Sequence, residues 1–334
     1  MALSDMIPPT TATKFLADAG WGGARLSPLA GDASFRRYFR VEHEGRHAVL
    51  MDAPPPQEDV RPFIMMAEYL HSIGLNVPGI IARDVEKGLL LIADFGNNRM
   101  REAVDEGREA ELPLYQAITD ILVELHSHNP PANLRRHGLM DWLDEVELLI
   151  DWYGPYVGLD LPRDSFRAAW QAVLAPVDGD ATPWVAELRD YHAENVMLID
   201  GASGLARFGL LDFQDARLGH PAYDLVSMLE DARRDVSPEV EAACLAHYVA
   251  ATARDDRFIR DYWALGAQRN TRILGLFCRL AVRDGKQGYK KYQPRMWGLI
   301  ERDLAHPHLA PVRAWYDAYI PPSHRTAFWQ DHGV

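Results

Sequence analysis

The sequence has few of the features that assign a protein to a class at once. Of its 334 residues only Cys244 and Cys278 are cysteine, and they lie too far apart for a CxxC redox or zinc motif. Isolated cysteines are typical of a reducing compartment, where they pack as small hydrophobic residues. No apolar run approaches the roughly 18–20 residues of a membrane span, and residues 1–20 lack the basic start and apolar block of a signal peptide. The chain is therefore predicted to be cytoplasmic, with no membrane partner.

Two further absences narrow the function. The sequence contains no G-x-x-x-x-G-K-[ST] phosphate loop and no G-x-S-x-G elbow for acyl transfer. The net charge is −13, which opposes nonspecific binding to nucleic acid because that affinity depends on clustered lysine and arginine. The predicted partner is a small molecule, and no nucleic acid is expected.

The histidines do not indicate a zinc site. The pairs His126/His128 and His306/His308 have no carboxylate or cysteine at the usual ligand spacing. They are interpreted as surface or helix-end residues.

The hydrophobic content of 48% is enough for one large core or two lobes. Residues 36–45 and 46–53 read as strands around a Glu44-Gly45 turn, and residues 87–95 read as a buried strand. A helix is predicted over 58–74, with Gly74 at its C-terminus. Beyond residue 96 the pattern is helical, and these helices are predicted over 112–128, 141–156, 164–176 and from Pro221 to about 320. We expect an α+β fold with a small β-rich N-terminal lobe, 1–95, a larger helical C-terminal lobe, 96–334, and a hinge near 93–98.

The tripeptide Asp94-Phe95-Gly96 matches the one that holds magnesium in protein kinases. That role needs an upstream loop with Asp followed five residues later by Asn, and nothing before residue 94 offers one. Asp94 is therefore predicted to lie at the nucleotide-binding hinge, where backbone groups meet the adenine edge. The alternative is an ordinary strand end.

A stronger candidate for the catalytic residues lies in residues 187–216. Asp190 and Asn195 have the D-x-x-x-x-N spacing, and Asp212 follows a predicted hairpin made of strands 196–199 and 205–211. The hairpin brings Asn195 and Asp212 to the same end, where two oxygen ligands suit Mg²⁺. Asp190 is left to face the acceptor hydroxyl. The alternative is a group of solvated loop side chains.

These residues resemble the aminoglycoside phosphotransferase and choline kinase-like family, whose members have a two-lobed protein-kinase-like fold. Within it, the blocks are most similar to bacterial kinases that phosphorylate the anomeric hydroxyl of N-acetylmuramate and N-acetylglucosamine in cell-wall recycling. The blocks run from residue 31 to 286: GDASFRRYFRV, AVLMDAPP, LRDYHAENVM, GLLDFQDARLGHPAYDLVSML and QRNTRILGLFCRLAVRDGK.

The resemblance implies roles for individual residues. Asp190 would accept the proton of the acceptor hydroxyl, and Asn195 and Asp212 would hold Mg²⁺. Asp224 would brace the catalytic loop through its backbone, so its loss should damage folding and activity together. ATP is the expected phosphoryl donor.

The sequence departs from the family pattern at three positions. Leu188 stands where the loop usually begins with His, and Gln214 replaces the glycine after Asp-Phe. Met51 lies about where a kinase carries the lysine that binds the α- and β-phosphates.

Because phosphoryl transfer needs positive charge near the phosphates, another cation must substitute for that lysine. Arg36 and Arg37 follow the turn 31–35, in which Gly31 and Ser34 would contact the phosphates. One of the two arginines is the candidate, with Glu68 as its partner. The alternative is a pair of exposed strand charges.

Substrate recognition is predicted for residues 268–286. Arg269, Arg272, Arg279 and Arg283 fall on roughly one helical face, and a sugar with a lactyl carboxylate could use a guanidinium. Asn270 could meet a sugar hydroxyl. The alternative for each arginine is an ordinary ion pair with a nearby acid.

The expected function is that of a monomeric, ATP-dependent and Mg²⁺-requiring kinase of an amino sugar. Two alternatives stay open: a kinase for another small hydroxylated acceptor, such as an aminoglycoside, and a nucleotide-binding pseudokinase. The presence of Asp190, Asn195 and Asp212 argues against the pseudokinase, because a protein released from catalysis has no chemical need for all three.

Overall fold

The structure, a computed structural model, describes residues 6–31, 35–179 and 183–325. The chain forms two compact units, and each contains two separate stretches of sequence. The first unit is Met1–Glu109 with Glu194–Ala216, and the second is Ala110–Ala193 with Arg217–Val334.

These units do not coincide with the predicted lobes 1–95 and 96–334. The difference arises because the hairpin after Asn195 makes backbone hydrogen bonds within the first unit. The N–H of Leu198 donates to the Asn98 carbonyl at 2.7 Å, and the N–H of Leu210 donates to the Asn76 carbonyl at 2.8 Å. The assignment of nucleotide binding and catalysis to separate lobes stays a prediction.

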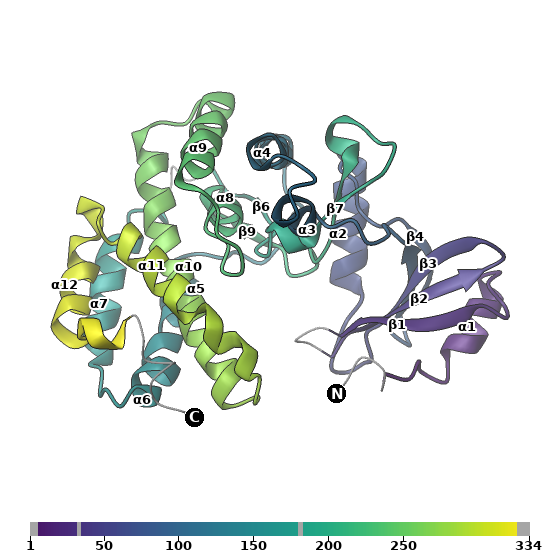
Figure 1. The fold of residues 1–334 in the computed structure, drawn as a ribbon, viewed down its shortest axis with the longest axis horizontal. Coiled ribbons are helices and arrows are strands. Elements are labelled where there is room, and N and C mark those ends of the chain that lie inside the picture. The colour runs from purple at the N-terminus through teal and green to yellow at the C-terminus, as the bar shows by residue number, and fades with distance from the viewer. Residues whose placement is uncertain (1–5, 32–34, 180–182, 326–334) are drawn as a thin grey trace. The chain divides into compact units, whose positions relative to one another are not determined.

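The first unit is built on a five-stranded antiparallel sheet in the order β1-β2-β3-β5-β4 (Figure 1). Its strands are β1 (Arg25–Gly31), β2 (Arg37–His43), β3 (Arg46–Asp52), β4 (Ile80–Asp84) and β5 (Leu89–Ala93). Side chains at alternate positions, such as Phe39 and Val41, form a buried cluster with Phe15 and Leu16. The last two belong to α1 (Ala12–Asp18), which therefore covers one face of the sheet.

The predicted turn between β2 and β3 is confirmed. Glu44 and Gly45 both have positive φ, 50° and 75°, as a tight two-residue hairpin turn requires. The chain then forms α2 (Arg61–Ser72), which ends just before Gly74 at φ 81°. The unit also contains α3 (Met100–Asp105) and the two-stranded hairpin β7 (Val196–Leu198) and β8 (Phe208–Leu210). Residues 205–207, expected to begin the returning strand, belong instead to a 3₁₀ turn, Gly204–Arg207.

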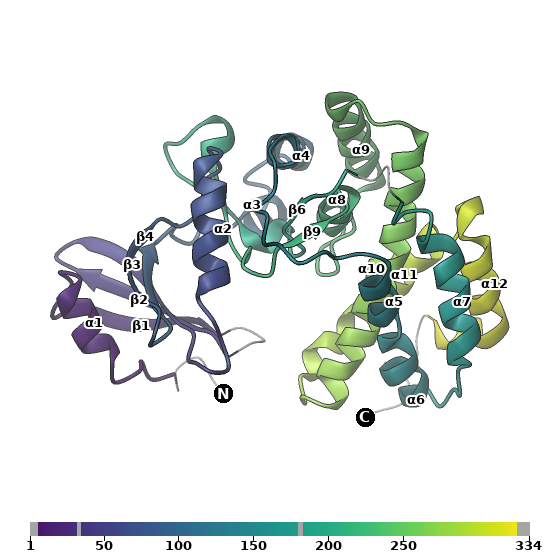
Figure 2. The same cartoon turned by 180° about the vertical axis from the view of Figure 1, so that it is seen from behind.

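The second unit is mainly helical, as predicted. Its longer helices are α4 (Glu111–Ser127), α5 (Leu139–Val146), α7 (Arg163–Leu174), α8 (Ala222–Leu229), α9 (Pro238–Thr252), α10 (Asp256–Val282), α11 (Gln293–Asp303) and α12 (Ala310–Tyr319). A short antiparallel sheet joins β6 (Val185–Glu187) to β9 (Arg217–Gly219). Figures 1 and 2 show α12 beside α7, where the rings of Trp315 and Phe166 have centroids 4.5 Å apart.

The single helix expected over 141–156 is interrupted. After α5 the chain forms a π-helical turn, η2 (Leu149–Tyr153), followed by α6 (Gly154–Tyr156). This segment packs very closely on α10, because a Cβ at Gly275 would lie 2.4 Å from the backbone carbon of Leu148. Periodicity in the sequence does not report such a close approach.

The two cysteines are free and buried, as their interpretation as small hydrophobic residues predicts. Across the described ranges, no helix has both the length and the apolar character that crossing a membrane requires. The expected α+β class is confirmed by the antiparallel sheet of the first unit and the helices of the second.

Candidate active site

The hairpin that is predicted to carry the cation ligands is present in the first unit. Asn195 precedes β7 and Asp212 follows β8, and the antiparallel pairing brings them together. The Nδ2 of Asn195 lies 3.4 Å from Oδ2 of Asp212, and the Leu211 N–H donates to the Asn195 carbonyl at 2.9 Å. An amide oxygen and a carboxylate are the hard ligands that Mg²⁺ prefers. The two side chains therefore fit the predicted cation, whose binding stays a prediction.

Gln214 has a direct contact with this pair. Its Nε2 donates to Oδ1 of Asp212 at 2.7 Å, while Asp212 itself has a left-handed backbone with φ 61°. The residue that departs from the family pattern therefore orients the carboxylate. Nothing in the sequence around Gln214 predicts this contact.

Arg36, rather than Arg37, lies beside Asp212, the predicted cation ligand. Its Nη2 is 3.8 Å from Oδ1 of Asp212 and 3.6 Å from Oδ2 of Asp215, and its side chain is 9% exposed. Arg37 instead donates from Nε to Oδ2 of the buried Asp52 at 2.8 Å. Of the two candidates, Arg36 is the one placed to supply positive charge near Asp212.

The expected partner of these arginines is wrong. Glu68 pairs with Arg83 at 3.1 Å on the surface of the unit, because its position on α2 directs it toward β4. Met51 is 1% exposed and lies between Tyr38 and Leu90 in the sheet, so its side chain belongs to the core.

The predicted phosphate turn is described only in part. Gly31 ends β1 opposite Arg37. Ser34 lies outside the described residues, and the contribution of both residues to phosphate binding stays a prediction.

Asp94 is part of the turn that follows β5. Its carboxylate accepts from Nε of Arg40 at 2.6 Å and from the Gly96 N–H at 2.8 Å. Arg40 also donates to the Gly96 carbonyl at 3.0 Å. The carboxylate thus stabilises the turn, and nucleotide binding at this segment stays a prediction.

The loop predicted to be catalytic starts after β6, in the stretch of the second unit that ends at Ala193, and α8 holds its first residues. The N–H groups of Leu188 and Arg189 donate to the two carboxylate oxygens of Asp224 at 2.6 and 2.8 Å. The hydroxyl of Ser227 donates to the Arg189 carbonyl at 3.0 Å. These bonds are the predicted brace, and they hold Arg189 at φ 71°, an uncommon conformation for a residue with a side chain. Burial and the charge of Glu187 raise the pKa of Asp224 to about 8.

Asp190, next in the chain, lies in a positive environment. Burial by itself would raise its pKa, but nearby positive charge lowers it below its usual value. The charge comes from Arg272, Arg269 and Arg189, because burial lowers the pKa of His192 to about 4 and leaves that ring neutral at pH 7. The Asp190 carboxylate is therefore ionised at neutral pH, as a proton acceptor must be.

The three predicted substrate residues of α10 have different surroundings. Arg269 is 3% exposed and donates from Nη2 to the Ser227 hydroxyl at 2.8 Å. Because that hydroxyl donates to the Arg189 carbonyl, Arg269 stabilises the loop indirectly. Asn270 is fully buried and donates from Nδ2 to Glu230 and, at 2.9 Å, to Asp303. A side chain with no exposed surface cannot touch a sugar, so the prediction for Asn270 is not supported by its position.

Arg272 is the exception, since 22% of its side chain is exposed. Its Nε lies 3.4 Å from Oε1 of Glu145. Contact with the acceptor stays a prediction for this residue.

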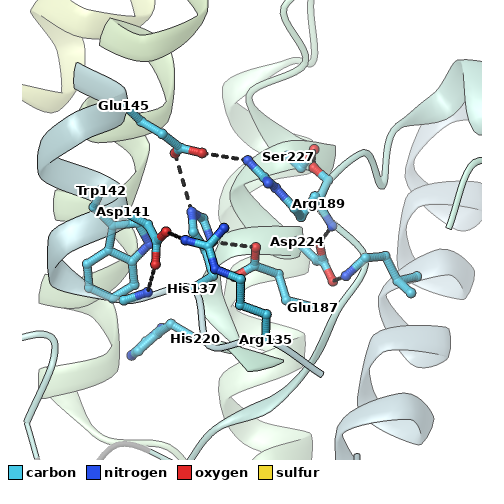
Figure 3. A network of polar contacts seen from close by, with 12 residues as sticks. Arg135, His137, Asp141, Trp142, Glu145, Glu187, Arg189, His220, Asp224 and Ser227 are labelled. Atoms are coloured by element: carbon cyan, nitrogen blue, oxygen red, sulfur yellow. Dashed lines mark hydrogen bonds and ion pairs between the residues drawn. The ribbon is translucent and has the colours of Figure 1, made fainter. Parts of the chain in front are cut away.

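Sequence reasoning missed a buried network next to the catalytic loop (Figure 3). Glu145 of α5 accepts from Nη2 of Arg189 at 2.6 Å and pairs with Nε2 of His137 at 3.3 Å. The other ring nitrogen of His137 pairs with Glu187 at 2.7 Å. Nothing in the sequence distinguishes Glu145 from Asp144 or Glu147 on the same predicted helix.

Comparison with known proteins identifies the family. Residues 25–262 match the family described as the phosphotransferase enzyme family (APH). This range includes Arg36, the hairpin with Asn195 and Asp212, and the loop with Asp190.

Curated relatives are similar over most of the chain. An N-acetylmuramate/N-acetylglucosamine kinase of Caulobacter vibrioides is 37% identical over 92% of this chain and 95% of its own. A protein of the same name from Pseudomonas aeruginosa is 34% identical over 88% of this chain and 89% of its own.

Solved structures share the fold at low sequence identity. A choline/ethanolamine kinase family protein from Mesorhizobium loti matches with a TM-score of 0.62 and 16% identity, over 90% of this chain and 97% of that one. The GDP and kanamycin complex of APH(2")-IIia matches with a TM-score of 0.62 and 16% identity, over 89% and 99%. The expected protein-kinase-like fold of the aminoglycoside phosphotransferase type is confirmed, and the chain belongs to the phosphotransferase enzyme family.

Proposed function

We propose that the protein is an ATP-dependent, Mg²⁺-requiring kinase that phosphorylates the anomeric hydroxyl of N-acetylmuramate, N-acetylglucosamine or both. The product would be the sugar 1-phosphate, formed in peptidoglycan recycling. The protein would act as a monomer in the cytoplasm, on the free sugar.

One observation carries the proposal. The relatives named N-acetylmuramate/N-acetylglucosamine kinase are similar along nearly the whole of both chains, at 37% and 34% identity. A match over 92% of this chain extends well beyond the loop with Asp190, which supports a shared acceptor as well as a shared fold.

The residues of the first unit suit the donor side of the reaction. Asn195 and Asp212 would hold Mg²⁺, which neutralises phosphate charge when bound. Arg36 supplies a guanidinium next to Asp212. It would replace the charge of the lysine whose position Met51 occupies, because a guanidinium binds phosphate oxygens well.

The residues of the second unit suit the acceptor side. The Asp190 carboxylate would orient the C1 hydroxyl and accept its proton as the sugar oxygen bonds to the γ-phosphorus and ADP departs. The anomeric hydroxyl is the most acidic hydroxyl of the ring, so it is the easiest proton for a carboxylate to accept. Three arginines near Asp190 also favour a neutral or acidic acceptor over a polycationic aminoglycoside.

The test is an ATP-consumption assay over N-acetylmuramate, N-acetylglucosamine and several aminoglycosides, followed by NMR of the product. We expect turnover with the amino sugars and a phosphorus coupling to H1 of the product.

Two modified acceptors test which hydroxyl of the sugar receives the phosphoryl group. The methyl glycoside of N-acetylglucosamine keeps the ring but blocks C1, and the alditol lacks the anomeric hydroxyl. Neither should be phosphorylated. Turnover of the methyl glycoside at a rate close to that of the free sugar would exclude the anomeric hydroxyl as the acceptor.

A further inference from the structure

Glu145 connects three parts of the second unit. Its Oε1 accepts from Nη2 of Arg189 at 2.6 Å and lies 3.4 Å from Nε of Arg272. Its Oε2 accepts from Nε2 of Gln268 at 3.2 Å and pairs with Nε2 of His137 at 3.3 Å. One carboxylate of α5 therefore contacts the catalytic loop and two successive turns of α10.

The contact with Arg189 bears on the position of Asp190. Arg189 is the residue before Asp190, and its left-handed backbone is costly for a residue with a Cβ. Asp224 holds the N–H of this residue, and Ser227 holds its carbonyl. Glu145 holds its side chain, so the backbone and side chain of Arg189 are anchored from two different helices, α8 and α5 (Figure 3).

The contact with Arg272 is relevant to binding of the acceptor. Of the predicted substrate residues, Arg272 has a partly exposed side chain, whereas Arg269 and Asn270 are buried. An ion pair with Glu145 reduces the rotamers open to a long side chain, which lowers the entropy cost of binding a ligand.

The charges favour the same arrangement. Burial by itself would raise the pKa of Glu145, but Arg272, His137 and Arg189 together hold it below its usual range. The carboxylate is therefore charged at neutral pH and balances cations that would otherwise repel one another.

We propose that Glu145 is a positioning residue for phosphoryl transfer, which sets the direction of Asp190 through Arg189 and holds Arg272 ready for the acceptor. The inference rests on the proposed function, since it assumes that Asp190 accepts the proton. Glu145 acts through these two arginines and does not itself exchange a proton with the substrate.

Glu147 provides a matched control. It lies two residues from Glu145 and also bridges two arginines, Arg163 and Arg167, each at 2.5 Å. Those arginines belong to α7, and neither is next to the catalytic loop. Glu147→Gln removes the same charge and two ion pairs without releasing Arg189.

The experiment compares steady-state kinetics of wild type, Glu145→Gln, Arg189→Gln, the double variant and Glu147→Gln, each below its own Tm. We expect Glu145→Gln to lower kcat by roughly 10- to 100-fold, as a small misplacement of a reacting group does. The KM for ATP should stay within about twofold, while the KM for the sugar rises. Glu147→Gln should resemble the wild type.

The double variant distinguishes an effect of Glu145 that acts through Arg189 from an independent loss of activity. If Glu145 acts through Arg189, the double variant should be no slower than the slower single variant. Arg189→Gln also serves as a second test should Glu145→Gln fold poorly, because it removes the other partner of the same ion pair.

Three results would overturn the inference: a normal kcat in folded Glu145→Gln, multiplicative losses in the double variant, or an equal loss in Glu147→Gln. Failure of the proposed function looks different. In that case the wild type itself does not turn over amino sugars, and the variants are compared on whichever acceptor the wild type phosphorylates.

Discussion

Arg36 and Asp212 lie 176 positions apart in the sequence, and the guanidinium Nη2 of Arg36 is 3.8 Å from the carboxylate Oδ1 of Asp212. The arginine is almost fully buried, so its charge acts in a region of low dielectric constant. A cation beside a predicted magnesium ligand is well placed to bind phosphate oxygens. Arg36 could therefore supply the positive charge that a lysine at the position of Met51 would carry.

Arg36→Ala should therefore lower kcat/KM for ATP by roughly 10-fold or more, because the positive charge proposed to bind the phosphates is lost. Met51→Leu is the matched control in the neighbouring strand and should leave the ATP kinetics unchanged. Normal kinetics for Arg36→Ala, together with faster turnover for Met51→Lys, would show that the phosphates bind elsewhere.

Asp190→Asn should lower kcat by on the order of 10²-fold or more, because an amide cannot accept the hydroxyl proton. The affinity for ATP should change little, and equilibrium binding of a nucleotide analogue measures it separately from turnover. A variant that retains most of its turnover would remove Asp190 from the mechanism.

Asp212→Asn should raise the Mg²⁺ concentration needed for half-maximal activity and also slow turnover, since a charged ligand is lost. Asp215→Asn is the control, because it removes a charge three residues away that also faces Arg36. The two variants are compared by magnesium titration at saturating ATP. Identical titrations for Asp212→Asn and the wild type would contradict the assignment.

The His137 network predicts a loss of stability at alkaline pH. Burial by itself would lower the pKa of His137, but Glu187 and Glu145 outweigh it and raise the pKa to about 9 from the usual 6.5. The folded protein therefore binds more protons than the unfolded chain between these values. This contribution is fully present below about pH 6.5 and is lost as the pH rises through about 9.

The measurement is urea unfolding of the wild type and His137→Gln at pH 6.5 and 9.5. The difference in free energy of unfolding between the two proteins should shrink by about 1–3 kcal/mol over this range. A constant difference would mean that His137 does not titrate in this window.

The elements with strong local patterns could be predicted from the sequence, and the weaker ones could not. β2, β3 and β5 lie in the middle of the sheet and carry clear apolar runs, and all three were expected. β1 and β4 are its edges and were missed. Edge strands are half solvated and tolerate polar residues and proline, such as Pro28 in β1, so their sequences carry less signal.

The candidate site divides in the same way. The spacing of Asp190 and Asn195 and the hairpin before Asp212 are local features, since a few residues and one turn place these groups, and the sequence alone was enough to propose them. The partners of these groups depend on packing between distant segments. Only the assembled sheet places Arg36, and not Arg37, beside Asp212. Only the packed helices leave Arg272 as the partly exposed residue of the three on α10 and bring Glu145 to Arg189. Local patterns restrict the conformation of neighbouring residues, whereas a long side chain such as arginine takes the partner that tertiary packing brings within its reach.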